Sequence, residues 1–244
     1  MAPNLYVFLP AFRNQMTATT MLTTHMLAQE CWRRGIGFAI SAVSWPDIAD
    51  LRGMAATYLI DRLPQASHLL FIDDDMSFKP ELVMDMLLFN EPVVGALYPK
   101  RCYPLEFAGS GSENPEVRGG FVKCDGVGMG VTLIQRHVFE VIAEKMPDTI
   151  DTNLENSGLA GMFGGDPLKR ILKPFEKVRH EINGGVLSED FSFCQRWRQC
   201  GGEVWASATH TIQHIGNHAF EGNFHDWSEM KRREKDAAGD AVAS

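Results

Sequence analysis

The chain has 244 residues, of which 45% are apolar and 22% charged, and its 23 basic and 31 acidic residues give a net charge of −8. This composition is typical of soluble globular proteins and excludes collagen-like, coiled-coil and disordered classes. A chain of this length can bury about 70 to 75% of its unfolded surface, which is enough for one large domain or two small ones without disulfides or metals. We favour one domain. The acidic balance argues against nucleic acid as a partner, because phosphate neutralisation requires a basic face.

The cysteines and the apolar runs bear on the cellular compartment. The five cysteines are odd in number and form no C-x-x-C pair, so neither a disulfide framework nor a cysteine zinc site is indicated. No signal core precedes the first apolar run, and no run approaches 18 apolar residues. We therefore expect a cytoplasmic protein with no membrane span.

The first hundred residues alternate between short apolar runs and segments with helical spacing of apolar residues. The predicted strands are 5–9, 37–43, 68–72 and 93–97, and the predicted helices are 17–34, 48–64 and 80–90. Alternating elements with uniformly apolar strands form parallel sheets that helices cover on both faces. The pattern predicts an α/β fold whose N-terminal half is a Rossmann-like, nucleotide-binding sheet.

The alternation stops after Pro99, and a mixed second half follows. It contains a glycine-broken strand at 121–134, a helix at 135–145, a helix that begins at Ser188 and a strand at 203–208. The stretch 147–185 is too long for a plain connection, so it is a candidate lid or substrate loop. We predict a single catalytic domain over 1–236, with a nucleotide-binding half at 1–100, an acceptor and metal half at 101–218, a C-terminal helical segment at 219–236 and a disordered tail at 237–244.

Three consecutive carboxylates, Asp73 to Asp75, follow the apolar run that ends at Ile72. This is the carboxyl edge at which open α/β sheets bind ligands. At roughly 5 Å and an effective dielectric near 20, each like-charge pair costs about 3 kcal/mol, so the triplet needs hydrogen-bond donors or a bound cation. Oxygen ligands favour Mg²⁺ or Mn²⁺ completed by substrate phosphates. The alternative is an acidic loop whose aspartates cap backbone N–H groups.

The triplet and three further segments resemble glycosyltransferases of the GT-A fold, closest to the family 2 type. The segment 71–76 resembles their D-x-D motif, 126–136 their glycine-rich strand before a helix, 188–190 their E-D motif, and 210–216 the histidine after their last strand. The resemblance covers about residues 4 to 218 and implies a GT-A architecture, a mixed sheet with helices on both faces.

The resemblance also implies roles for individual residues. Asp73 would contact the ribose side of a nucleotide sugar, with Asp74 beside it, and Asp75 would bind the divalent ion that bridges the diphosphate. His214 would complete the metal site, for which we name Asp73, Asp75 and His214 as candidate ligands. Asp190 would be the general base, and its place in a first helical turn after Ser188 favours the charged carboxylate. The alternative for Asp190 is simple complementation of the helix dipole.

Five further positions are expected near the nucleotide. The residues Pro10, Phe12 and Arg13 follow the first strand, where the family places the base, and Gly128 lies in the glycine-rich segment. Arg52 lies on the second helix, where the family commonly has an arginine near the nucleotide, although an exposed surface arginine is an equally good explanation. The acidic residue that the family uses to recognise uracil is missing after the second strand, so the base is left open.

The resulting hypothesis is a Mn²⁺- or Mg²⁺-dependent glycosyltransferase that moves a sugar from a nucleoside-diphosphate sugar to the hydroxyl of an unidentified acceptor, such as a glycan or a lipid-linked sugar. Direct attack assisted by one base implies inversion at the anomeric carbon. Two alternatives stay open. A nucleotidyltransferase would use the same acidic site to attack an α-phosphate, and a non-catalytic protein would bind nucleotide sugars or glycans without turnover.

Overall fold

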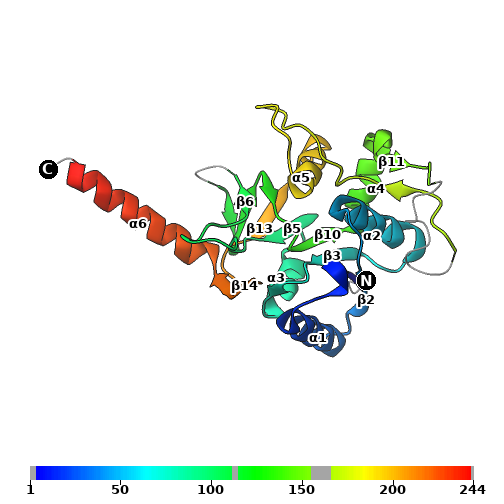
Figure 1. The fold of residues 1–244 in the computed structure, drawn as a ribbon, viewed down its shortest axis with the longest axis horizontal. Coiled ribbons are helices and arrows are strands. Elements are labelled where there is room, and N and C mark those ends of the chain that lie inside the picture. The colour runs from blue at the N-terminus through cyan, green and yellow to red at the C-terminus, as the bar shows by residue number, and fades with distance from the viewer. Residues whose placement is uncertain (1–3, 112–114, 155–165, 243–244) are drawn as a thin grey trace.

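The computed structural model describes residues 4–111, 115–154 and 166–242, and an eight-stranded mixed sheet forms its centre (Figure 1). The strand order is β2-β1-β3-β10-β5-β13-β8-β7. The strands of this sheet are β1 (Asn4–Pro10), β2 (Gly37–Val43), β3 (His68–Ile72), β5 (Val93–Ala96), β7 (Val117–Arg118), β8 (Phe121–Cys124), β10 (Val131–Gln135) and β13 (Val204–Ser207).

Three small sheets and six α-helices complete the described structure. The small sheets pair β4 (Met76–Ser77) with β14 (Ile212–Ile215) and β15 (Ala219–Gly222), β6 (Gly109–Ser110) with β9 (Gly126–Val127), and β11 (Ile150–Asp151) with β12 (Ile171–Leu172). The helices are α1 (Ala18–Arg33), α2 (Ile48–Arg62), α3 (Glu81–Phe89), α4 (Arg136–Lys145), α5 (Glu189–Gln199) and α6 (Phe224–Val242), with 3₁₀ turns at Phe12–Asn14 and Pro147–Thr149. None of the helices in the described ranges combines the length and the hydropathy needed to cross a bilayer.

The central sheet is covered on both faces because its strands are apolar at successive positions. In β1, Tyr6 and Phe8 belong to one hydrophobic core with residues of α2, α4 and α5, whereas Leu5, Val7 and Leu9 belong to a second core with residues of α1 and α3. The alternation follows from the two-residue period of a strand, which sends successive side chains to opposite faces. Both cores are thus built on the same strands.

The predicted mixed α/β architecture is confirmed, with a parallel N-terminal group and helices on both faces. Strands β2, β1 and β3 run parallel to one another. Strand β10 pairs antiparallel with both β3 and β5, so it separates the third and fourth predicted strands. Strand β13 is parallel to β5 and antiparallel to β8. The late strand β10 therefore joins the nucleotide-side strands to the second half of the chain.

Two local predictions need correction. Strand β2 is not buried on both sides, because it is the edge strand and all seven of its residues are half-buried or exposed. The segment 219–236 is not helical from its start, since Ala219–Gly222 form β15, and α6 then continues to Val242, into the segment expected to be disordered. In Figure 1, α6 extends away from the rest of the molecule. Of the predicted loop 147–185, residues 155–165 lie outside the described residues, and the remainder contributes β11 and β12.

Candidate functional site

The acidic triplet lies at the carboxyl end of β3, as the sequence predicts, and backbone hydrogen bonds hold it in place. The Asp73 N–H donates to the Gly130 carbonyl at 2.9 Å, which ties the triplet to the glycine-rich segment before β10. The Asp75 carbonyl accepts from the Ile215 N–H at 2.8 Å, and β4, which follows the triplet, pairs with β14. The C-terminal end of β3, the N-terminal end of β10 and the C-terminal end of β14 therefore lie next to one another.

Asp75 and His214 form a pair that is suited to a divalent cation. The His214 Nδ1–H donates to the Pro99 carbonyl at 2.9 Å, so in the neutral ring the electron pair lies on Nε2, which is 3.4 Å from Asp75 Oδ2. Ligating histidines are commonly oriented by such a second hydrogen bond. Cis ligands of an octahedral ion with bonds near 2.1 Å lie about 3.0 Å apart, which is close to the observed separation. The donor set therefore fits a cation held by two protein ligands and completed by phosphates and water.

The predicted three-residue metal set is not assembled in this structure. Within residues 4–111, 115–154 and 166–242, no three His, Cys, Asp or Glu side chains form a group that could hold a metal ion. Asp73 turns away to Arg52, whose Nη2 lies 3.0 Å from its Oδ1. Arg101 Nη1 meanwhile lies 3.0 Å from Asp75 Oδ2, so the same carboxylate oxygen faces both an imidazole and a guanidinium.

Arg52 is the centre of a buried ionic cluster. Its side chain is 3% exposed, and it contacts three carboxylates from two distant parts of the chain: Asp73, Glu189 at 3.0 Å, and Asp190. Burial acts against its charge, but Asp190, Asp73 and Glu189 together hold the pKa of Arg52 above its ordinary value. The alternative of an exposed surface arginine is therefore wrong. In this structure the guanidinium is taken up by three carboxylates, and its place near a nucleotide stays a prediction.

Asp190 lies in the first turn of α5, as predicted, and is fixed from two sides. One carboxylate oxygen contacts Arg52, and the other accepts the Met129 N–H at 3.1 Å. Burial raises the pKa of Asp190 to about 7, against the opposing effects of Arg52 and the Met129 N–H. Ser188 occupies the N-cap position, but its side chain makes no capping hydrogen bond. A carboxylate that titrates near neutrality is suited to accepting a proton at physiological pH.

Asp74 has a structural contact rather than a free carboxylate. Its Oδ2 accepts the Phe12 N–H at 2.7 Å, and its carbonyl accepts the Thr17 N–H at 2.9 Å. Burial raises its pKa above the ordinary value, and the Phe12 hydrogen bond opposes that shift. Of the two interpretations of the triplet, capping of a backbone N–H group describes this contact of Asp74, and its contact with a nucleotide stays a prediction.

The loop after β1 reaches this site through that same hydrogen bond. Pro10 is buried at the end of β1, whereas the Phe12 ring is 66% exposed and the Arg13 guanidinium carbon lies 5.0 Å from the centre of that ring. Arg13 has a left-handed backbone with φ of 55°. Phe12 and Arg13 thus present an open aromatic and cationic surface beside the triplet, and their contact with a base stays a prediction.

Gly128 serves packing and is not open to a ligand. A Cβ atom at this position would lie 2.2 Å from the Tyr98 hydroxyl oxygen, so the ring of Tyr98 fills the space that the prediction assigned to the nucleotide. Tyr98 is buried and lies edge-on to His214, with ring centres 5.5 Å apart. Gly128 therefore permits the close approach of a side chain that supports the metal-ligand candidate.

Sequence reasoning missed Glu189, Tyr98 and the Met129 N–H as parts of this site. Glu189 stands in the E-D motif, and that motif was the available signal for it. Lys100 and Arg101 both follow the fourth predicted strand. Two basic residues at that strand end were the available signal that a positive charge lies at the carboxyl edge of the sheet. Nothing in the sequence marks Tyr98 or a main-chain donor, because their roles come from contacts between distant segments.

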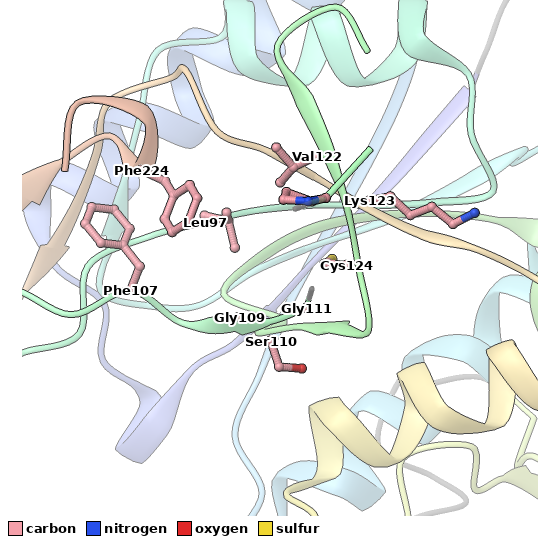
Figure 2. Close-up of a pocket in the computed structure, with 10 residues that line it drawn as sticks. Leu97, Phe107, Gly109, Ser110, Gly111, Val122, Lys123, Cys124 and Phe224 are labelled. Carbon is pink, nitrogen blue, oxygen red and sulfur yellow. The ribbon is translucent and has the colours of Figure 1, made fainter. Parts of the chain in front are cut away.

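A separate apolar cavity of about 150 Å³ lies between the central sheet and the start of α6. Figure 2 shows its lining, in which Phe107 and Phe224 face each other near Leu97, with Val122 and Cys124 on a neighbouring strand. None of the predicted site residues lines this cavity, so it is distinct from the site at the acidic triplet.

No protein-family model matches this sequence, and no curated protein matches it. Among solved structures, it is similar to A197 from STIV, with 14% identity, 88% of this chain and 86% of that chain covered, and a TM-score of 0.48. It is also similar to the catalytic domain of Drosophila beta1,4-galactosyltransferase 7 (14% identity, 88% and 72% covered, TM-score 0.46) and to UDP-glucose pyrophosphorylase (8% identity, 88% and 93% covered, TM-score 0.45). Glycosyltransferases thus occur among the structures of similar fold. At these identities the similarity concerns the fold alone, so the activity has to be argued from the site.

Proposed function

We propose that this protein is a divalent-cation-dependent glycosyltransferase that moves a sugar from a nucleoside-diphosphate sugar to an acceptor hydroxyl. The observation that carries the proposal is the pairing of Asp75 Oδ2 with His214 Nε2 at 3.4 Å, at the carboxyl end of β3. In the neutral imidazole these two atoms are electron-pair donors that face each other, which is an arrangement suited to binding a cation. A Mn²⁺ or Mg²⁺ ion bound there would neutralise the charge of a leaving diphosphate.

The proton chemistry is assigned to Asp190. In the proposed step the acceptor hydroxyl oxygen bonds to the anomeric carbon, the bond from that carbon to the diphosphate oxygen breaks, and Asp190 takes the hydroxyl proton. Two observations support this role: the raised pKa near 7, and the fixed position between Arg52 and the Met129 N–H. A single base acting opposite the leaving group implies inversion at the anomeric carbon.

Arg52 is proposed as the residue that positions this base. Its guanidinium joins Asp190 on α5 to Asp73 on the triplet, and Asp73 lies two residues before Asp75. The base and the cation ligands are therefore held in one rigid arrangement, and a rigid arrangement of reacting groups is a large part of catalytic rate enhancement.

The main alternative is a nucleotidyltransferase that uses the same site. It gains some support from the full engagement of Asp190, because a carboxylate held by Arg52 and a backbone amide can also be purely structural. The two activities release different products: a glycosyltransferase releases a nucleoside diphosphate, whereas a nucleotidyltransferase acting with a nucleoside triphosphate releases pyrophosphate.

The test is an assay for both products with a panel of nucleotide sugars, and of nucleoside triphosphates paired with sugar 1-phosphates as nucleophiles, with Mn²⁺ and with a chelator. Our proposal predicts cation-dependent release of a nucleoside diphosphate, including slow hydrolysis of the donor when no acceptor is present. Release of pyrophosphate alone would assign the protein to the alternative activity. Absence of both products, together with cation-dependent stabilisation by a nucleotide sugar, would indicate binding without turnover.

A further inference from the structure

Arg101 occupies the place where a cation would act on Asp75. Its Nη1 lies 3.0 Å from Asp75 Oδ2, the same oxygen that faces His214 Nε2 at 3.4 Å. The Asp75 side chain is 17% exposed, whereas that of Arg101 is 51% exposed. The carboxylate is therefore held in place, and the arginine is free to move into solvent.

The stem of Arg101 runs over Gly216 in the turn between β14 and β15. A Cβ atom added to Gly216 would lie 3.0 Å from Arg101 Cδ and 3.7 Å from Cγ. The Gly216 N–H donates to the His218 carbonyl at 2.9 Å, which closes the turn under the arginine. Because Gly216 has no side chain, the stem of Arg101 can pack directly against the backbone of this turn, and its guanidinium then reaches Asp75.

A guanidinium and a divalent ion cannot share this oxygen without strong repulsion. Two like charges a few ångströms apart near a protein surface cost several kcal/mol, and both would compete for the lone pairs of Oδ2. Binding of a cation by Asp75 and His214 therefore requires Arg101 to leave. The displaced guanidinium starts beside the phosphates that would complete the shell of the cation, and a planar, permanently charged group is well suited to binding them.

We propose that Arg101 is an exchangeable counter-ion: it neutralises Asp75 when no cation is bound, and it moves to the diphosphate of the donor when the cation binds. This inference rests on the proposed function, because it requires a cation and a diphosphate at the same site. It makes the binding of the two ligands cooperative. The cation frees the arginine for the diphosphate, and the diphosphate holds the arginine away from the cation ligand.

The test is the effect of Arg101→Ala on two separate equilibria. The dissociation constant of Mn²⁺ alone is measured by electron paramagnetic resonance, and that of pyrophosphate is measured by calorimetry at saturating Mn²⁺. We expect Mn²⁺ alone to bind about 2- to 5-fold more tightly to the variant, because a half-exposed ion pair no longer competes. We expect pyrophosphate to bind about tenfold more weakly, because a charge-assisted hydrogen bond is lost.

The matched control is Lys100→Ala, which removes the neighbouring charge. Lys100 pairs with Glu106 at 3.0 Å, and neither constant should change by more than about twofold on its loss. Gly216→Ala serves as a second variant that keeps the charge but crowds the arginine stem, and it should shift Mn²⁺ affinity in the same direction as Arg101→Ala. Thermal unfolding without ligands confirms that each variant is folded.

The opposite signs of the two shifts make the outcome decisive. If Mn²⁺ binds wild type and Arg101→Ala equally, or if both ligands bind the variant more weakly, Arg101 does not exchange between Asp75 and the diphosphate. The cation site of the proposed function would still stand in that case. If pyrophosphate affinity is unchanged, the arginine does not reach the phosphates and the proposal fails. If Mn²⁺ binds neither protein, the cation site of the proposed function fails and the exchange fails with it.

Discussion

The substitution Arg52→Met tests whether the buried cluster holds the site together. Arg52 is 3% exposed and contacts three carboxylates whose side chains are 16 to 27% exposed. Methionine has a similar length but no charge, so it leaves three acids facing each other without a counter-charge. Breaking a buried ion pair from one side costs about 3 to 5 kcal/mol, and the partial exposure of the acids places the expected loss near the lower end, about 3 kcal/mol.

For a chain of this length, a loss of about 3 kcal/mol lowers the melting temperature by roughly 6 to 12 °C. The effect should depend on pH. Burial already raises the pKa of Asp190 to about 7 in the wild type, and Arg52 opposes that shift. Without the guanidinium this pKa rises further, so the folded variant takes up a proton more readily. The destabilisation should therefore be larger at pH 8, where the buried carboxylates are more fully charged, than at pH 5, where protonation relieves it.

The assay is urea unfolding of wild type, Arg52→Met and Arg62→Met at pH 8 and pH 5. Arg62 is the matched control, because it lies on the same helix, is exposed and, among the residues that the structure describes, donates to the backbone carbonyls of Asp166 and Pro167. Its loss should cost less than about 0.5 kcal/mol. If Arg52→Met is as stable as Arg62→Met at pH 8, or if its loss is the same at both pH values, the cluster does not have the energetic role that we assign to it.

Three further outcomes are expected. Asp190→Asn should lower the transfer rate by about a hundredfold or more while donor binding persists, and a fully active variant would exclude Asp190 as the base. In the wild type, kcat/KM should fall as the pH drops below the Asp190 pKa of about 7. His214→Ala should weaken Mn²⁺ binding at least about tenfold. His210→Ala, which removes hydrogen bonds to Ser207 and Asp85, should leave Mn²⁺ binding unchanged; equal affinities of the two variants would remove His214 from the metal site. Gly128→Ala should destabilise the protein by about 1 to 3 kcal/mol through the clash with Tyr98, and unfolding as stable as that of wild type would show that the ring moves freely.

Local patterns predicted most of the elements. The predicted strand 68–72 coincides with β3, and the predicted start of α5 after Ser188 is also correct, because a buried apolar run and a residue type that favours the N-cap position can be read from neighbouring residues. The insertion of β10 between β3 and β5 was not predictable in this way. Which strands become neighbours depends on how distant segments pack, and the residues of one strand do not reveal its neighbours.

The candidate site shows the same division. The position of the triplet after β3 and of Asp190 on α5 followed from sequence, since both depend on where an element ends or begins. The burial of Arg52 did not, because its partners Glu189 and Asp190 lie more than 130 residues away. Gly128 was expected near the nucleotide because it lies in the glycine-rich segment, whereas the structure packs the ring of Tyr98 against it.

The central claim is that Asp75 and His214 hold a divalent cation against the phosphates of a nucleotide. Crystals grown with Mn²⁺ and a nucleoside diphosphate, measured at the manganese absorption edge, test it most directly. We predict an anomalous peak within bonding distance of Asp75 Oδ2 and His214 Nε2, with diphosphate oxygens on its other side. A peak at another site, or no peak while Arg101 remains on Asp75 in crystals that contain the nucleotide, would contradict the claim.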